Sequence, residues 1–312
     1  MTMTADIAPP GGAAAGPLDR SGGGSVGGPA PARPRLSKTV KRRLAGLFWG
    51  MASIGLFAGI WELLWYLDLA NPLLLPPPHL FLQDIPGTLK FFDRSNKVGS
   101  VATGGGLGAL LITMGWTTFR VMVGLGLGFV LGTAVGALIH YVKIARNLLL
   151  PTILLLAPVS PVAWLPVAIF VFGIGDVPAI FLVFITVFFA IVLSTGSQIA
   201  SVPKNYLHVA RIMGATERQT FWRVILPAIL PSLFMTIRLN LFGAWMVVLI
   251  AEAVGVGTGL GQITSMARAT FNAKLVFFTM AIIGVLGFLS DWALRTVQRK
   301  MLWWVAPDGG SR

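Results

Sequence analysis

Cysteine is absent from the sequence, and motifs for metal or nucleotide chemistry are absent with it. With no Cys among its 312 residues, the chain has no disulfide, no Cys metal site and no thiol nucleophile. The three histidines, His79, His140 and His208, are scattered and lack the spacing of metal ligands. No GxxxxGK[ST] phosphate-binding loop occurs, so the chain cannot supply ATP hydrolysis itself. We therefore expect no catalytic residue, no metal and no cofactor within this chain.

Charge is also scarce, and long apolar runs take its place. Charged residues make up 11% of the chain and hydrophobic residues 55%, whereas soluble domains carry about 25% charged residues. A membrane-spanning helix needs about 20 mainly apolar residues. Six stretches meet this requirement: residues 45–67, 118–141, 148–171, 177–198, 229–254 and 275–297. The composition predicts an all-α polytopic membrane protein with about six transmembrane helices.

The net charge of +13 is better explained by the topology of the chain in the membrane than by binding of nucleic acid. Its Lys and Arg residues lie mostly between the apolar runs, seventeen on the side of the N-terminus and five on the other side. Because Lys and Arg are enriched in the cytoplasmic segments of membrane proteins, we expect both termini in the cytoplasm. The polar segment between the fourth and fifth spans is then cytoplasmic too. The lipid bilayer is the expected partner, and nucleic acid is not.

The segments outside the spans differ in character. Residues 1–44 are rich in Gly, Ala and Pro and contain no apolar run, which predicts a disordered cytoplasmic tail. Residues 45–305 would form the membrane domain, and 306–312 a short cytoplasmic C-terminal tail. Within 68–117 we expect an interfacial helix at the start and an amphipathic approach to the second span over 107–114.

The polar stretch 203–231 predicts two short helices separated by a break. Gly214 is suited to the left-handed conformation that ends a helix over 204–213. Thr216 followed by Gln219 has the form of a capping box that opens the next helix. Such a helix pair with an apolar face could insert into a groove on a partner. The alternative is an interfacial loop that only connects two spans.

The same stretch resembles the EAA loop of ABC-importer permeases. That pattern is Glu-Ala-Ala, three residues, Gly, nine residues and Ile-x-Leu-Pro. The corresponding residues here are His208, Val209, Ala210, Gly214, Ala215, Val224, Leu226 and Pro227. His208 replaces the usual Glu, and this departure puts a charge-assisted contact of that carboxylate in doubt. The resemblance implies that 203–223 is a coupling loop that docks on an ATP-binding subunit.

Three further segments extend the resemblance over about residues 45–305: 118–121, 158–175 and 245–261. They are similar to the branch that imports nitrate, bicarbonate, sulfonates and taurine. The resemblance implies a type I ABC-importer permease (MetI-like) fold in the bacterial inner membrane, which moves a small solute inward by alternating access. The implied partners are two copies of an ATP-binding subunit that holds ATP and Mg, a second permease copy, and an external solute-binding protein.

Four residues are candidates for the translocation pathway: Trp245, Glu252, Pro158 and Pro161. Trp245 and Glu252 are seven residues apart and so share a helix face. A carboxylate inside the membrane is a functional candidate by default, although Glu252 could instead pair with Arg120 or Arg238. Prolines break or kink a span, and broken spans often line transport paths. Bending to fit neighbouring helices is the alternative explanation.

Other intramembrane residues have simpler expected roles. Arg120 and Asp291 lie near the predicted span ends, where snorkelling to the interface would explain them. A run of glycines in the second span favours close helix packing: Gly124, Gly126, Gly128, Gly132 and Gly136. The rival function is an ion-gradient-driven secondary transporter or channel, but the sequence shows no internal repeat and only one convincing deep acid, Glu252. The substrate itself cannot be identified from the sequence.

Overall fold

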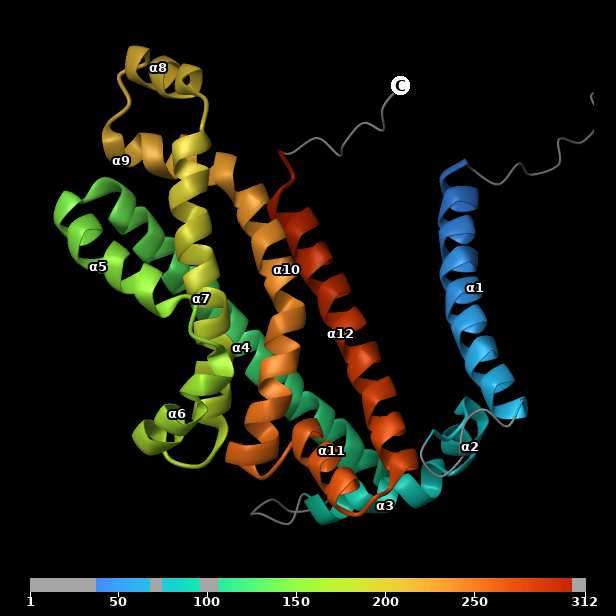
Figure 1. Cartoon of the computed structure of the whole chain (residues 1–312). Helices are drawn as coiled ribbons and strands as arrows, with labels where there is room; N and C mark the ends of the chain where they lie inside the picture. The colour runs from blue at the N-terminus through green and yellow to red at the C-terminus, as the bar shows by residue number, and fades with distance from the viewer. Residues whose placement is uncertain (1–37, 68–74, 96–105, 305–312) are drawn as a thin grey trace, which may run out of the picture. The chain divides into compact units, whose positions relative to one another are not determined.

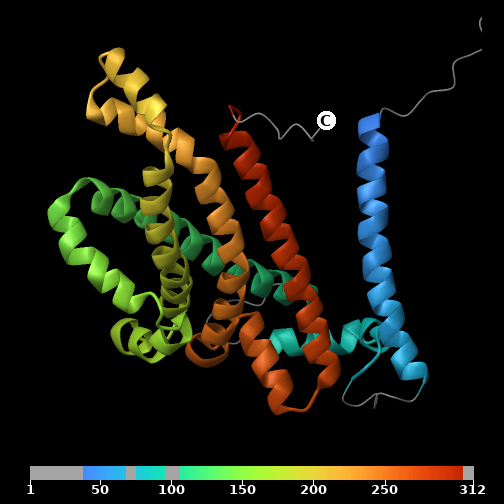
Figure 2. The same cartoon turned by 45° about the horizontal axis from the view of Figure 1, so that its top comes forward.

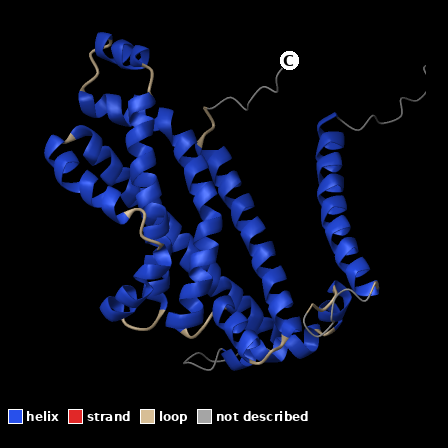
Figure 3. Cartoon of the chain, viewed as in Figure 1, coloured by secondary structure: helices blue, strands red, loops and turns tan. Residues whose placement is uncertain are grey.

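The computed structural model describes residues 38–67, 75–95 and 106–304. The chain divides into two compact units, residues 1–56 and 57–312, and each is considered by itself. All regular structure in the described residues is helical (Figure 3). The C-terminal tail predicted for 306–312 and most of the tail predicted for 1–44 lie outside these residues. The first helix begins at Lys38, within the latter segment.

Figure 1 shows the helices in chain order. Their bounds are α1 Lys38–Tyr66, α2 Pro78–Gln83, α3 Ile85–Ser95, α4 Gly106–Tyr141, α5 Lys143–Leu156, η1 Pro161–Trp164, α6 Leu165–Phe172, α7 Asp176–Ser201, α8 Lys204–Ile212, α9 Glu217–Thr220, η2 Phe221–Ile225, α10 Leu226–Ala251, η3 Glu252–Val256, α11 Leu260–Ala269 and α12 Ala273–Met301.

Five helical segments in the described residues are long and apolar enough to cross a membrane. They are Phe48–Tyr66, Gly106–Tyr141, Asp176–Ser201, Glu217–Val256 and Ala273–Met301. The bent pair of Lys143–Leu156 and Pro161–Phe172 brings the number to six if it counts as one span. The predicted all-α membrane architecture is therefore confirmed.

The third predicted span is broken rather than kinked. Its two halves meet at an angle of 101°. Ser160, which precedes Pro161, has an extended backbone with ψ of 133°, because a residue before proline is pushed away from the helical region. Pro158 and Pro161 thus lie at the break itself, and Pro161 begins the short helix η1.

Helix α4 corrects the prediction for the second span. It runs continuously from Gly106 to Tyr141. The expected amphipathic approach over 107–114 is therefore wrong as a separate element, because these residues form the first turns of α4. Where one interfacial helix was expected in the preceding segment, the structure has two short helices, α2 and α3, and α3 buries Phe92 against Phe278 of α12 with ring centroids 6.3 Å apart.

Glycines on one face of α4 allow close contact with α7. A Cβ added at Gly124, Gly128, Gly132 or Gly136 would lie 2.6–2.9 Å from the Cβ of a residue of α7. The four α7 residues have the same spacing of four: Val183, Val187, Ile191 and Thr195. The prediction of close packing is confirmed for these glycines. It is wrong for Gly126, which faces open space.

Two ends of the 57–312 unit are distinct in both views of the chain (Figures 1 and 2). The short helices α8 and α9 lie at one end, which we name the α8–α9 end. Helices α6 and α11 lie at the other, which we name the α6–α11 end. The long helices α7, α10 and α12 run between these ends (Figures 1 and 2).

The glycine face gives a direct test of the packing. We expect Gly128→Leu to lower the free energy of unfolding by about 1–3 kcal/mol, because the added side chain overpacks the contact with Val187. Gly126→Leu on the same helix is the matched control and should leave the thermal unfolding midpoint in detergent near that of the wild type. Equal midpoints for the two variants would contradict the assigned interface.

Candidate functional site

The coupling-loop stretch forms the predicted pair of short helices. Helix α8 is followed, beyond its C-cap Met213, by Gly214, whose φ of +74° lies in the left-handed region that favours glycine. The Ala215 N–H donates to the Ala210 carbonyl at 3.0 Å, which closes the end of the helix as expected for a glycine C-cap. The predicted left-handed Gly214 is confirmed, although α8 proper ends at Ile212.

The predicted capping box is also present. The Gln219 N–H donates to Thr216 Oγ1 at 3.3 Å, and the Thr216 N–H donates to Gln219 Oε1 at 3.0 Å. After α9 a π-helical turn, η2, leads directly into α10, in which Pro227 lies in the first turn. The loop is therefore a defined structure joined directly to a membrane-spanning helix.

Helix α8 has an inner and an outer face. Ala210 is buried, and Leu207 packs with the cluster that contains Ile225. On the outer side an apolar stripe is exposed, with exposed fractions between 55% and 86%: Tyr206, Val209, Ile212 and Met213. We name these four residues the α8 stripe. Since residues three and four apart lie on one helix face, the stripe is a continuous surface.

The residues aligned with the EAA pattern lie on α8, at the turn after it and at the start of α10. His208 and Val209 are exposed on α8, while Ala210 is buried and Ala215 is half-buried. Gly214 is at the turn, and Leu226 and Pro227 begin α10. Four cationic residues lie on or beside the exposed surface: Lys204, Arg211, Arg218 and Arg223. The outer surface is thus apolar and basic.

A second cluster lies at the α6–α11 end and is centred on Arg120. Its side chain is only 2% exposed, and Nη1 donates to Glu252 Oε1. Nε donates to Asp176 Oδ1 at 2.8 Å, and Nη2 donates to Thr258 Oγ1 at 3.0 Å. One guanidinium therefore connects α4 to the start of α7 and to the turn between η3 and α11.

Glu252 is completely buried and uses both carboxylate oxygens. Oε1 accepts from Arg120, and Oε2 accepts from the Gly261 N–H at 2.9 Å. Gly259 has a φ of +108°, and a Cβ there would collide with the Glu252 carboxylate. A Cβ at Gly261 would collide with the Leu249 carbonyl. The Gly259-Leu260-Gly261 segment is therefore shaped to enclose Glu252.

These contacts bear on the two roles left open for Glu252. Of the two arginines proposed as partners, Arg120 is the one that pairs with it, and a substrate would have to displace Arg120 or Gly261 to reach the carboxylate. Trp245 is buried as well, with an exposed fraction of 4%. Both residues face the interior of the chain, as predicted, and the contacts of Glu252 favour a role in holding the bundle together.

The prediction that Arg120 and Asp291 lie near span ends and snorkel to the interface is wrong. Because α4 extends back to Gly106, Arg120 lies well inside the helix rather than near its end. Asp291 is 7% exposed, and its two oxygens accept from Arg238 Nε at 2.9 Å and Arg295 Nε at 2.6 Å. Each buried charge is therefore neutralised by a partner on another helix, which is the usual condition for burying it.

The candidate prolines differ from Trp245 and Glu252 in their exposure. Pro158 is exposed and Pro161 is half-buried. Pro161 borders a pocket of about 220 Å³ between the break and α7. Thr186 and Phe189 of α7 line the same pocket. The break in the third span therefore lies next to open volume, and the sealed Glu252 carboxylate does not.

Sequence reasoning missed Asp176 and Thr258 in the Arg120 cluster. Asp176 lies 56 residues from Arg120 in sequence, and Thr258 lies 138 residues away. Asp176 begins α7 directly after Gly175, and an acidic residue in the first turn of a helix is a recognisable signal. Thr258 gives no signal in the sequence, because its role depends on how the turn before α11 folds back.

A family model described as "binding-protein-dependent transport system inner membrane component" matches residues 124–303. The match covers more than half of the chain. The chain belongs to this family. It is thus the membrane-spanning permease subunit of an ABC importer, as the resemblance implied, and it acts in transport with an ATP-binding subunit and a solute-binding protein. The rival prediction of an ion-gradient-driven transporter or channel is not supported.

Relatives and a solved structure agree with the family. A probable ABC transporter permease protein of Brucella melitensis is 33% identical over 185 residues, which cover 59% of this chain and 75% of that protein. The taurine transport system permease protein of Escherichia coli K12 is 28% identical over 257 residues, covering 81% and 88%. A chain of the inward-facing MetNI methionine ABC transporter superposes with a TM-score of 0.54 at 23% identity, covering 61% and 95%. The last comparison confirms the predicted MetI-like fold of the permease.

The Arg120 cluster yields a stability prediction for the permease. We expect Glu252→Gln to lower the free energy of unfolding by about 3 kcal/mol, because it removes one partner of a buried ion pair. The measurement is the thermal unfolding midpoint of the purified permease in detergent. Asp176→Asn is the matched control, since the Asp176 side chain is 45% exposed and water can replace its contact.

A double variant completes the test. Arg120→Gln combined with Glu252→Gln should lose less stability than the sum of the single variants, because residues in direct contact do not act independently. Additive losses, or equal losses from Glu252→Gln and Asp176→Asn, would contradict the assigned pairing.

Proposed function

We propose that this permease imports a small solute with an oxyanion group, driven by ATP hydrolysis on a partner that docks on α8. The observation that carries the proposal is the α8 stripe, held outward by the left-handed turn at Gly214. An amphipathic helix that presents an apolar stripe suits insertion into a groove on another protein. The inner face of α8 is already packed, so the stripe is free for the partner.

The α8–α9 end is proposed to be cytoplasmic. Lys204, Arg211, Arg218 and Arg223 all lie at this end, and basic residues are enriched in cytoplasmic segments. The ends of α1 and α12 assigned to the same side carry further Lys and Arg residues. The ATP-binding subunit is a cytoplasmic partner in this arrangement, and both termini of the permease lie on its side.

ATP and Mg are proposed to bind to that partner and not to the permease. The sequence lacks a phosphate-binding loop, and the described residues contain no group of three or more His, Asp or Glu side chains placed to hold a metal. In this proposal the permease contributes transport, and the partner contributes ATP hydrolysis. Two permease copies, each with one α8, would engage two copies of the ATP-binding subunit.

The proposed substrate class rests on the relatives and on the charges of the bundle. The Escherichia coli relative is named for taurine, which carries a sulfonate. The one fully buried carboxylate of the described residues, Glu252, is neutralised by Arg120, so it does not repel an anion. Selection among nitrate, bicarbonate, sulfonate and taurine is assigned to the external solute-binding protein.

The pathway is proposed to follow the break in the third span. Pro158 and Pro161 interrupt the helix beside a pocket of about 220 Å³, and broken spans commonly line transport paths. Trp245 and Glu252 are proposed to act indirectly, by fixing α10 to the rest of the bundle. Movement of α8 would pass through η2 into α10 and change the access of this region from one side of the membrane to the other.

Substitutions of Gly214 test the docking role of α8. We expect Gly214→Val to reduce substrate uptake at least about tenfold, because a β-branched residue at this φ is strained and reorients α8. Gly214→Asn is the matched control, since Asn tolerates the left-handed conformation. Uptake and ATP hydrolysis are measured in proteoliposomes that contain the permease, the ATP-binding subunit and the solute-binding protein.

Membrane insertion provides the internal check. Space around Gly214 is open, so both variants should insert and purify like the wild type. Uptake at the wild-type rate by a correctly inserted Gly214→Val permease would overturn the assignment of α8 as the docking element.

A further inference from the structure

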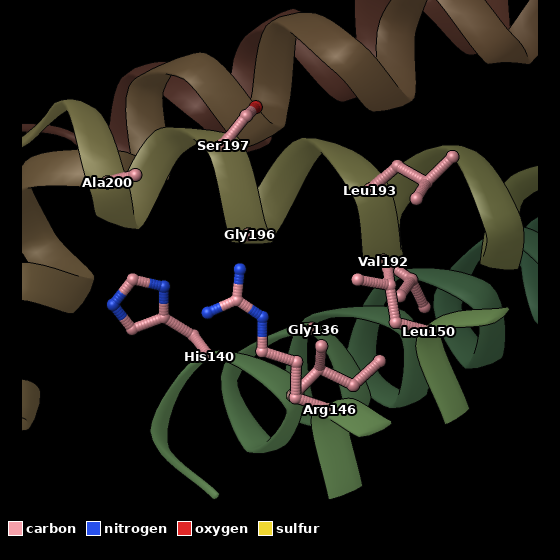
Figure 4. A pocket seen from close by; sticks show the side chains of 10 residues that line it. Gly136, His140, Arg146, Leu150, Val192, Leu193, Gly196, Ser197 and Ala200 are labelled. Carbon is pink, nitrogen blue, oxygen red and sulfur yellow. The ribbon is translucent and has the colours of Figure 1, made fainter. Parts of the chain in front are cut away.

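A basic pocket opens between α4, α5 and α7 near the α8–α9 end. Its volume is about 350 Å³. Figure 4 shows the side chains that line it. They are Gly136, Ile139 and His140 of α4, Arg146 and Leu150 of α5, and Val192, Leu193, Gly196, Ser197 and Ala200 of α7. We name it the His140–Arg146 pocket.

Two groups that can carry positive charge point into this pocket. The Arg146 guanidinium extends toward Gly196, and the His140 ring lies beside it (Figure 4). Neither side chain forms a hydrogen bond or an ion pair with another described residue. No Asp or Glu is among the lining residues. The five N–H donors of Arg146 are therefore available to an oxyanion, which a guanidinium binds through paired hydrogen bonds.

The opposite part of the pocket is apolar. Ile139, Val192, Leu150 and Leu193 belong to one hydrophobic cluster of the bundle. The pocket thus combines a cationic end with a hydrocarbon wall between membrane helices. Basic pockets between transmembrane helices on the cytoplasmic side suit the headgroups of anionic lipids. The proposed orientation places this pocket on that side.

The backbone of α7 leaves the space in front of Arg146 open. Gly196 lies opposite the guanidinium (Figure 4), and a Cβ added there would meet no atom within 4 Å. Gly136, by contrast, is packed against Thr195 and the Val192 carbonyl. Gly196 is therefore not required for helix packing, and its lack of a side chain keeps the volume accessible.

His140 also lines a second pocket, of about 200 Å³, beneath the coupling loop. Arg211 of α8, Ala215 and Glu217 of α9 border that second pocket. A ligand that contacts His140 in the first pocket would therefore lie one side chain away from the loop that docks on the ATP-binding subunit.

We propose that the His140–Arg146 pocket binds an oxyanion, either the phosphate of an anionic lipid headgroup or free inorganic phosphate. Arg146 holds the phosphate oxygens through paired N–H donors, and His140 contributes a further N–H. In the lipid case an acyl chain lies along Leu150 and Leu193. The proposal rests on the proposed function only for the side of the membrane on which the pocket lies.

The experiment measures ligand retained by the full-length permease. The protein is extracted from membranes that contain phosphatidylglycerol and phosphatidylcholine, and bound lipid is quantified by native mass spectrometry. In a parallel arm, inorganic phosphate is added to delipidated protein, and the shift in thermal unfolding midpoint is recorded. Retention of phosphatidylglycerol over phosphatidylcholine identifies the lipid, and a midpoint shift with phosphate alone identifies the free anion.

Two variants change different properties of the pocket, its charge and its volume. Arg146→Gln removes the charge, and Gly196→Leu fills the open volume without changing any charge. Each should reduce the retained anion at least about tenfold, since a hydrogen bond to a charged group is lost or blocked. Lys143→Gln, on the same helix as Arg146 but outside the pocket, and Gly126→Leu, which faces open space on α4, are the matched controls.

The outcomes separate this proposal from the proposed function. Both arms are binding measurements that need neither ATP nor transport, so a failure of uptake in the Gly214 experiment leaves them interpretable. Equal retention by Arg146→Gln, Gly196→Leu and the controls would overturn the pocket assignment. Equal retention of phosphatidylcholine, together with no effect of phosphate, would overturn it as well.

Discussion

A buried guanidinium must have a counter-charge, and the pairing of Arg120 with Glu252 is the constraint on which much of this bundle depends. Moving an unpaired ion from water into a low-dielectric interior costs several kcal/mol, so the two side chains must meet whenever the bundle closes. They lie 132 residues apart in sequence. Their contact fixes α4 against the end of α10, and the contact of Arg120 with Asp176 adds α7. The rest of the packing follows from this arrangement: glycines bring α4 and α7 into close contact, and α10 continues through η2 to the loop at the opposite end.

The features that depend on neighbouring residues could be predicted from the sequence, and those that depend on distant partners could not. The left-handed Gly214 and the Thr216–Gln219 capping box are local, and both were predictable from spacing alone. The glycine face was predictable only in part: four glycines recur every four residues, whereas Gly126 is offset by two residues and so lies on another face. The broken third span was foreseen as a kink, because prolines signal an interruption but not its angle of 101°. The pairing of Glu252 with Arg120 was one of two alternatives that the sequence left open, whereas the predicted place of Arg120 near a span end was wrong, because the start of α4 was placed too late.

The loop that contains α8 must expose an apolar surface and still remain folded against the bundle. A docking helix has to leave its apolar stripe uncovered, yet an uncovered stripe would destabilise a loop that had no other packing. Here Leu207 packs on the cluster of Ile225 and Ala210 is buried, while the stripe stays exposed. Because η2 joins the loop to α10 without a flexible linker, a force applied at α8 reaches a helix whose far end is held by Glu252. In the proposed coupling role, the loop would move α10 relative to the ion pair that holds its far end.

The same reasoning bears on where a solute can pass. A path requires volume that opens and closes, whereas the Glu252 cluster is closed by hydrogen bonds to Arg120 and Gly261 that would have to break at a high cost. The break at Pro158 and Pro161 has no comparable network across it, and it borders open volume beside α7. Helices that meet at a break can change their angle without losing buried ion pairs. We therefore propose the α5–α6 break, rather than Glu252, as the moving part of the transport cycle. An anion that followed this route would meet no unpaired carboxylate at Glu252.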